Sequence, residues 1–217
     1  MWRVSWPMLE FDAVIFDLGG VITHPQNPDK LDELASLLAS PLDRESFRRA
    51  YSEPRRDYDR GIIGSDEYWR RVAAASGSPL AEAASSTWRQ LLPRLTRVDI
   101  EGWFDIRPAM IDLIGRLKTE VAHVALLSNI NRECADHLDA HFNWLDLFDV
   151  VVYSCDHRLL KPERAIFDLC LSKLGRPKGP CLFIDDLEEN VEGARAAGLR
   201  AIRFVDEEGL VEALGLS

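Results

Sequence analysis

Five short apolar runs constrain the fold of this chain more than any other feature of its sequence. They are rich in Val, Ile, Leu and Phe, and they cover residues 13–17, 121–128, 150–154, 181–185 and 201–205. Continuous apolar runs of this length are typical of strands that are buried on both faces of a sheet. Such a sheet is usually parallel and covered by helices on either side, so the sequence predicts an α/β fold.

Helical segments separate most of these runs. Residues 108–118, 163–174 and 189–197 carry apolar side chains at helical spacing. Pro108 stands where the first of these helices would begin, and Gly198 stands where the last would end. Strand and helix therefore alternate along the chain, which predicts a doubly wound, Rossmann-like parallel sheet.

The segment between the first and second runs breaks this alternation. It has no convincing strand, and its helix-forming stretches cover residues 31–39, 44–51, 65–75 and 80–91. A chain of 217 residues can bury one sizeable core and still form a small second unit. We therefore predict an all-helical cap domain at residues 24–106, inserted into a core domain formed by residues 1–23 and 107–217.

The composition excludes several classes of protein. The formal net charge of −10 argues against a surface for nucleic acid or an anionic membrane. No run reaches the roughly 18 apolar residues of a membrane span, and residues 1–10 lack an apolar run of signal-peptide length. The four cysteines form no C-x-x-C pair and no zinc-type spacing with histidines, so we expect reduced thiols. These features predict a cytoplasmic protein.

Polar groups that can carry chemistry stand where the strands are expected to end. They are Asp17 with the Gly19-Gly20 turn after the first run, Ser128-Asn129 after the second, Lys161 after the third and Asp185-Asp186 after the fourth. Ligands of doubly wound sheets bind at the carboxyl ends of the strands, so we expect these groups to meet. Together they offer a carboxylate nucleophile, neutral hydrogen-bonding groups, a cation and an acidic metal site.

Each of these groups also has a purely structural explanation. An acidic pair after a strand is often a helix N-cap, a Lys-Pro pair is a common start of a helix, and Ser-Asn is common in turns. Any one of the four motifs alone would therefore be weak evidence for a site. Their order, and the position of all four at strand ends, favour a shared site over four separate structural roles.

In order and spacing the four motifs resemble those of the haloacid dehalogenase superfamily, and the resemblance extends from Phe11 to Val205. Within that superfamily the sequence is most similar to phosphatases with an inserted helical cap, such as bacterial glucose-1-phosphate phosphatases. The resemblance implies a hydrolase in which Asp17 attacks phosphorus and forms an aspartyl-phosphate. Its partner would be a small phosphorylated metabolite, such as a sugar phosphate, and the enzyme would be a monomer or a homodimer.

The resemblance also implies a magnesium site. Mg²⁺ prefers a near-octahedral shell of oxygen ligands, which usually includes carboxylates, waters and substrate phosphate. Asp17, Asp186 and the main-chain carbonyl of Gly19 would be the ligands from the protein. Asp185 would either support them from behind or serve as an alternative ligand.

Three further residues would act on the phosphoryl group. The resemblance implies that Ser128 and Asn129 hydrogen-bond its oxygens during transfer. Lys161 would bind there as well, and it would offset the negative charge of the phosphate and of the carboxylates around it. We therefore expect Ser128 and Lys161 to contribute directly to catalysis.

One position departs from the family pattern. Most phosphatases of the family carry a second aspartate two residues after the nucleophile, and here that position is Gly19. The missing carboxyl acts as general acid for the leaving group, which is typically worth about 10²–10⁴ in rate. We therefore expect a comparatively acidic leaving group, such as an anomeric hydroxyl, an enol or a phenol. His24 is a candidate for the missing proton donor, although a single histidine in a loop is more often exposed and inert.

Two other functions stay open. A haloacid dehalogenase would also use Asp17, but such enzymes need no divalent cation, and the acidic pair disfavours this alternative. A weakened binding or regulatory module would explain Gly19, but it would not explain why Asp17, Lys161 and Asp186 are all present. Phosphatase activity therefore remains the preferred interpretation.

The predicted cap contains two features whose interpretation is mainly structural. Residues 55–60 are almost all charged and are expected to form a solvated helix face, from which one arginine could turn inward to meet substrate. Large aromatic side chains are expected mostly to pack within the cap or between cap and core, and these are Trp69, Trp88, Trp103 and Phe104.

Overall fold

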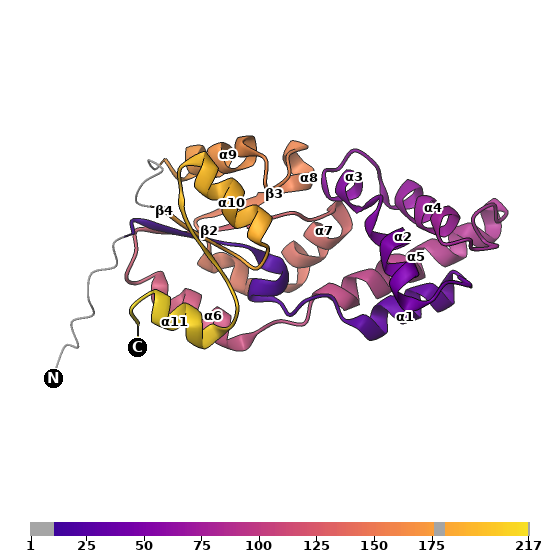
Figure 1. Cartoon of the computed structure of the whole chain (residues 1–217), viewed down its shortest axis with the longest axis horizontal. Helices are drawn as coiled ribbons and strands as arrows, with labels where there is room; N and C mark the ends of the chain where they lie inside the picture. Colours follow the sequence, from indigo (N-terminus) through magenta and orange to yellow (C-terminus); the bar gives the residue numbers. More distant parts are fainter. Residues whose placement is uncertain (1–10, 176–180, 217) are drawn as a thin grey trace.

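The computed structural model of the chain describes residues 11–175 and 181–216. Two lobes lie side by side, one built around a sheet and one made of helices only (Figure 1). Residues 1–10, on which the expectation about a signal peptide depends, lie outside the described residues. No helix in the described part of the chain is long and apolar enough to cross a membrane.

A single five-stranded sheet forms the centre of the first lobe. Its strands are β1 (Ala13–Phe16), β2 (His123–Ser128), β3 (Val150–Tyr153), β4 (Cys181–Asp185) and β5 (Arg200–Arg203). All neighbouring strands are parallel, and their order is β3-β2-β1-β4-β5. This confirms the predicted α/β fold with a doubly wound parallel sheet. The strands begin and end within a few residues of the predicted runs.

Apolar layers cover both faces of this sheet. Alternate residues of β1 point to opposite faces, so Val14 and Phe16 join one buried cluster while Ala13 and Ile15 join the other. The helices that supply these layers are α6 (Pro108–Leu117), α7 (Arg132–His141) and α11 (Glu207–Ala213) on one face, and α9 (Arg164–Leu174) and α10 (Glu188–Ala197) on the other. Burial on both faces explains why the strands are continuously apolar.

The second lobe has its own apolar core. It consists of α1 (Pro28–Leu37), α2 (Arg44–Ser52), α3 (Arg55–Asp59), α4 (Ser65–Ala75) and α5 (Ser85–Trp103). Trp69 and Trp88 lie at the centre of this lobe, as expected for packing residues. Next to the first lobe, Thr23 and Ile106 form an antiparallel bridge, so the segments that lead into and out of the helical lobe run side by side.

The predicted helix at residues 80–91 is wrong in both of its limits, because α5 begins at Ser85 and continues to Trp103. The hydroxyl of Ser78 accepts a hydrogen bond from the main-chain N–H of Leu80, which favours a turn there over a helix. Pro93 lies inside α5 and removes one backbone hydrogen bond. The helix nevertheless continues, because its apolar face packs into the core of the lobe on both sides of the proline.

Candidate active site

The carboxyl ends of the central strands bring four predicted residues together. Asp17 follows β1, and its main-chain N–H donates a hydrogen bond to the carbonyl of Ile184 in the neighbouring β4. One carboxylate oxygen from each of Asp17, Asp185 and Asp186 lies within 4.8 Å of the other two. The Nζ atom of Lys161 lies 2.7 Å from Oδ1 of Asp17 and 2.7 Å from Oδ2 of Asp185. We call Asp17, Lys161, Asp185 and Asp186 the core cluster.

The Gly19-Gly20 turn allows the acidic pair to come close to Asp17. Gly20 has a φ of 76°, a conformation that L side chains rarely adopt. A Cβ atom at Gly20 would lie 2.4 Å from Oδ2 of Asp186, which is closer than real atoms approach. A Cβ atom at Gly19 would instead make an ordinary contact, 3.6 Å from the ring of Trp103. Position 20 therefore favours glycine for its backbone conformation, and a Cβ atom there would push Asp186 aside, whereas position 19 imposes neither constraint.

Lys161 is held in place by its neighbours in the first lobe. Its side chain is buried, and its main chain is fixed from both sides by the amide of Asn129. Oδ1 of Asn129 accepts from the Lys161 N–H at 2.9 Å, and Nδ2 donates to the Lys161 carbonyl at 3.0 Å. Asn129 therefore positions the lysine. The direct contacts of Ser128 and Asn129 with a phosphoryl group stay predictions.

The two members of the acidic pair differ sharply. Asp185 is fully buried and accepts hydrogen bonds from the N–H of Leu187 and from the amide of Asn190, in addition to its contact with Lys161. Asp186 is partly exposed, and no other described residue donates a hydrogen bond to its carboxylate. This arrangement suits Asp185 to orient the cluster and leaves Asp186 free to bind a ligand.

The core cluster has more negative than positive charge. Burial raises the pKa of the Asp17 carboxyl well above its usual range although Lys161 acts to lower it. Burial alone would lower the pKa of Lys161, but the attraction of Asp17 and Asp185 outweighs it and the pKa is raised. Burial, together with the charge of Asp185, also raises the pKa of Asp186. Three carboxylates beside one lysine favour the binding of a further cation.

The open oxygens of this cluster fit a divalent metal ion. Oδ1 of Asp17 is engaged by Lys161 and by the N–H of Leu18, whereas no described residue donates a hydrogen bond to Oδ2. Asp186 presents a second open carboxylate nearby. Two hard oxygen ligands beside a cavity suit Mg²⁺, which keeps several waters and binds substrate phosphate directly. The carbonyl of Gly19 stays a predicted third ligand.

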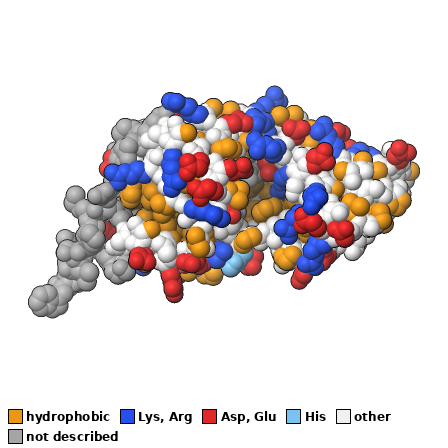
Figure 2. All heavy atoms as spheres, viewed as in Figure 1, with side chains coloured by type: hydrophobic (Ala, Val, Ile, Leu, Met, Phe, Trp, Pro, Cys, Tyr) orange, Lys and Arg blue, Asp and Glu red, His pale blue; other side chains and the backbone are white. Residues whose placement is uncertain are grey.

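A cavity of about 440 Å³ lies above the core cluster and extends to the helical lobe. Its walls on that side are formed by residues of α2 and α3 and by the end of α5, among them Arg48, Tyr51, Arg55, Arg56, Asp59 and Trp103. A smaller cavity of about 120 Å³ adjoins the same region, with Ser128 in its wall. Figure 2 shows Lys and Arg side chains near the junction of the lobes, on a face where charges are otherwise mixed.

The structure corrects the expectation that residues 55–60 form a solvated helix face. Tyr58 in α3 is only 2% exposed, and the side chains of Arg55 and Asp59 are 15% and 14% exposed. One arginine, Arg55, does turn inward to the cavity. The expectation failed because the partner that keeps Arg55 buried is Asp99, which lies in a different helix.

The structure also gives the positions of Trp103 and His24 and shows one residue that the sequence did not single out. Trp103 lines both cavities as well as packing between the lobes. His24 is exposed and lines neither cavity, so it is poorly placed to donate a proton. The sequence reasoning missed Asp99 altogether. The available signal was a carboxylate directly after Val98 on the apolar face of a helix, where only a buried partner makes a charge tolerable.

Comparison with known proteins gives one consistent family. The sequence pattern of the haloacid dehalogenase-like hydrolases matches residues 11–198. The sesquiterpene phosphatase astK of Aspergillus oryzae is 29% identical over 199 residues, which are 90% of this chain and 91% of that protein. Phosphatase MT3486 of Mycobacterium tuberculosis is 29% identical over 212 residues, which are 93% of this chain and 90% of that protein.

Solved structures show the same fold. A magnesium complex of the HAD family enzyme bt-2542 from Bacteroides thetaiotaomicron has a TM-score of 0.72 at 21% identity and covers 93% of this chain and 98% of that one. A complex of the same enzyme with magnesium and inorganic phosphate has a TM-score of 0.68 at 20% identity, over 92% of this chain and 98% of that one.

Proposed function

Because the chain belongs to the haloacid dehalogenase-like hydrolases, we propose that it is a magnesium-dependent phosphatase of small phosphomonoesters. The observation that carries this proposal is the core cluster, in which the open oxygens of Asp17 and Asp186 lie together beside a buried lysine. Two relatives of similar length are phosphatases, and one structural neighbour binds magnesium together with inorganic phosphate, which supports the same chemistry here.

Asp17 is the proposed nucleophile. The carboxylate oxygen of Asp17 that does not bind the metal attacks phosphorus, the bond between phosphorus and the leaving oxygen breaks, and an aspartyl-phosphate forms. Lys161 holds Oδ1 at 2.7 Å, so the carboxylate keeps one orientation throughout the reaction. Water then attacks phosphorus, and the bond to Asp17 breaks to release orthophosphate.

The remaining groups of the site stabilise the charge of the phosphoryl group and orient Lys161. Mg²⁺ bound by Asp17 and Asp186 would offset the charge that the phosphoryl oxygens bring into the site. Asp185 and Asn129 hold the lysine from its side chain and its main chain. The cavity of about 440 Å³ is of the size that takes a small phosphorylated metabolite.

Hydrolysis of p-nitrophenyl phosphate tests this proposal. We expect turnover that requires Mg²⁺ and that falls by roughly 10⁴ or more in Asp17→Asn, because the substituted amide cannot act as a nucleophile. Asp12→Asn is the matched control, since Asp12 is exposed at the opposite end of β1. Turnover that persists in Asp17→Asn, or that needs no divalent cation, would overturn the proposal. Release of chloride from 2-chloropropionate would instead favour the dehalogenase alternative.

A further inference from the structure

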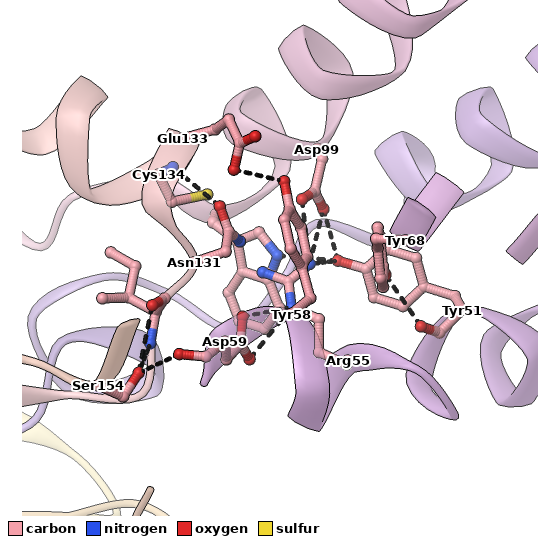
Figure 3. Close-up of polar contacts among 12 residues, drawn as sticks. Tyr51, Arg55, Tyr58, Asp59, Tyr68, Asp99, Asn131, Glu133, Cys134 and Ser154 are labelled. Carbon is pink, nitrogen blue, oxygen red and sulfur yellow. Dashed lines mark hydrogen bonds and ion pairs between the residues drawn. The ribbon is translucent and has the colours of Figure 1, made fainter. Parts of the chain in front are cut away.

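A second buried group of charges lies in the helical lobe, on the wall of the same cavity (Figure 3). Nε of Arg55 lies 3.0 Å and 3.2 Å from the two carboxylate oxygens of Asp59. Nη1 of Arg55 lies 3.0 Å from Oδ2 of Asp99, and the hydroxyl of Tyr51 also donates to Asp99. We call Tyr51, Arg55, Asp59 and Asp99 the cap cluster. The reaction proposed above assigns no task to it.

Two carboxylates share one guanidinium in the cap cluster. Asp99 is nearly inaccessible, and it accepts hydrogen bonds from both Tyr51 and Arg55. Asp59 contacts Arg55 and the side-chain amide of Asn131, and it lies at the edge of the cavity. Two buried carboxylates beside a single cation favour a proton on one of them. Burial raises the pKa of the Asp59 carboxyl to about 6, and the charge of Asp99 adds to this while Arg55 acts against it.

Asp59 is also in the right place to act on the leaving group. It lines both cavities together with Gly19, the position where most relatives in the family would carry their general acid. Among the described residues that line the larger cavity, the other carboxyl groups are already used or exposed. Asp17 and Asp186 belong to the core cluster, and Glu189 is exposed.

The position of Asp59 is fixed from the first lobe. The Ser154 hydroxyl donates a hydrogen bond to the main-chain carbonyl of Asp59, and the Tyr58 hydroxyl donates to Glu133 of α7 at 2.8 Å. The end of α3 is therefore attached to the lobe that carries the nucleophile. A proton donor on α3 would keep a constant position relative to Asp17.

We propose that Asp59 is the general acid and base of the reaction, in place of the aspartate that position 19 lacks. This inference depends on the proposed phosphatase function. When Asp17 bonds to phosphorus, the leaving oxygen keeps the electron pair of its broken bond and takes the proton of Asp59. When water attacks the aspartyl-phosphate, it gives a proton to the Asp59 carboxylate, and the electron pair of the breaking bond returns to Asp17. The sum of both steps is hydrolysis of the ester, with Asp17 and Asp59 restored.

The surroundings of Asp59 make its titration recognisable. The titratable groups that face it are Arg55 on its own helix, Tyr68 on α4, Asp99 on α5, Cys134 on α7 and Cys155 in α8 (Ser154–His157). Burial raises the pKa of the tyrosine and of both thiols, so these three stay neutral between pH 5 and 8. Arg55 stays charged over the same range.

Two esters with different leaving groups test the proposal in Asp59→Asn. Nitrophenolate leaves without a proton, so p-nitrophenyl phosphate should still give a burst of about one equivalent per enzyme, followed by slow turnover because the base for water is missing. Ethyl phosphate needs a proton on its leaving oxygen, and its turnover should fall by about 10²–10³ with no burst. Asp99→Asn is the matched control, because it removes the same charge from the same guanidinium. It should change the rates for both esters by the same factor.

The pH profile gives an independent reading. In the wild type, the ratio of kcat/KM for ethyl phosphate to that for p-nitrophenyl phosphate should fall as the pH rises through about 6, because Asp59 loses its proton. In Asp59→Asn this fall should be absent. The proposal would be overturned if Asp59→Asn, like Asp99→Asn, slowed both esters by the same factor. It would also be overturned if the wild type and Asp59→Asn had the same pH profile. Failure of the phosphatase function itself would be seen separately, as wild-type turnover that needs neither Mg²⁺ nor Asp17.

Discussion

The core cluster and the cap cluster face the same cavity, and in each of them the carboxylates outnumber the cations. Lys161 is shared by Asp17 and Asp185, with Asp186 nearby, and Arg55 is shared by Asp59 and Asp99. The two clusters differ in where their open oxygens lie. In the core cluster, open oxygens of two carboxylates converge, whereas in the cap cluster both oxygens of Asp59 contact the guanidinium.

That difference decides how each cluster can neutralise its surplus negative charge. Converging open oxygens can bind a divalent cation, which the core cluster would do with Asp17 and Asp186. A carboxylate whose two oxygens both contact a guanidinium has no open oxygen for a metal ion, so the surplus charge beside it favours a bound proton instead. A surplus of carboxylates would thus lead to the proposed metal site at the strand ends and to the proposed acid in the helical lobe.

Removing the central cation of each cluster should have the largest effect and should separate the two clusters. Lys161→Met and Arg55→Met each leave buried carboxylates unpaired, so we expect each to lower the free energy of unfolding by about 3–5 kcal/mol. Urea unfolding with and without Mg²⁺ measures this. Mg²⁺ should recover part of the loss in Lys161→Met, because the metal takes the place of the missing charge, and none of it in Arg55→Met. An equal response of the two variants to Mg²⁺ would contradict the comparison.

The proton on the cap cluster should appear as a pH-dependent stability. The pKa of Asp59 is about 6 in the folded chain and about 3.9 in the unfolded chain, so the folded state binds the proton more tightly. The resulting stabilisation is complete below pH 4 and is lost as the pH rises through 6. The free energy of unfolding of the wild type, relative to Asp59→Asn, should therefore be about 2 kcal/mol larger at pH 4 than at pH 7.5.

Chemical denaturation at both pH values checks this expectation. Asp57→Asn is the matched control, because Asp57 lies on the same helix, its side chain is 47% exposed and it pairs with Arg71 at the surface. A wild-type advantage over Asp59→Asn that stays constant from pH 4 to pH 7.5 would show that Asp59 is ionised throughout. The surplus negative charge of the cap cluster would then stay without a proton to neutralise it, and the comparison with the core cluster would fail.

The sequence predicts the core cluster much better than the cap cluster, and the reason is physical. Asp17 and Asp185 are placed by adjacent parallel strands, whose carboxyl ends meet at one edge of the sheet, and Lys161 follows β3 in the loop after α8. Short apolar runs reveal such strands directly, so both the fold and the meeting of these residues follow from the pattern. The sequence did not show which of Asp185 and Asp186 orients the cluster and which is free to bind a ligand. That difference depends on the hydrogen bonds that Leu187 and Asn190 donate to Asp185.

No comparable sequence pattern predicts the cap cluster. Arg55 and Asp99 are 44 residues apart and lie on helices whose packing angle no local pattern specifies. The charges of residues 55–60 are compatible with a solvated face, and the stretch is too short for an apolar period to reveal the buried side. Burial of Arg55 is a property of the assembled lobe, so it became visible only with the contacts themselves.

Adding a methyl group beside the proposed metal site should have a smaller effect than removing a charge. Gly20→Ala places a Cβ atom 2.4 Å from Oδ2 of Asp186 and also strains a backbone with a φ of 76°. Asp186 must move, and we expect Mg²⁺ affinity to fall by about 10–100-fold. Gly19→Ala is the matched control, since its Cβ meets only the Trp103 ring at 3.6 Å and should leave the affinity nearly unchanged. Calorimetric titration with Mg²⁺ distinguishes the two, and equal affinities would remove Asp186 from the proposed metal site.

The smallest expected effect concerns the hydrogen bond that joins the cap cluster's helix to the first lobe. Tyr58→Phe removes the bond to Glu133 but keeps the ring, which is stacked on Tyr68 with centroids 4.3 Å apart, so we expect a loss of about 1 kcal/mol. Tyr153→Phe is the matched control, because its hydroxyl donates to Asp139 at 2.7 Å within the first lobe. Both variants should lose similar stability, but hydrogen exchange of the α3 amides should become faster only in Tyr58→Phe. Unchanged exchange would mean that the remaining contacts of α3 suffice to hold Asp59 in place.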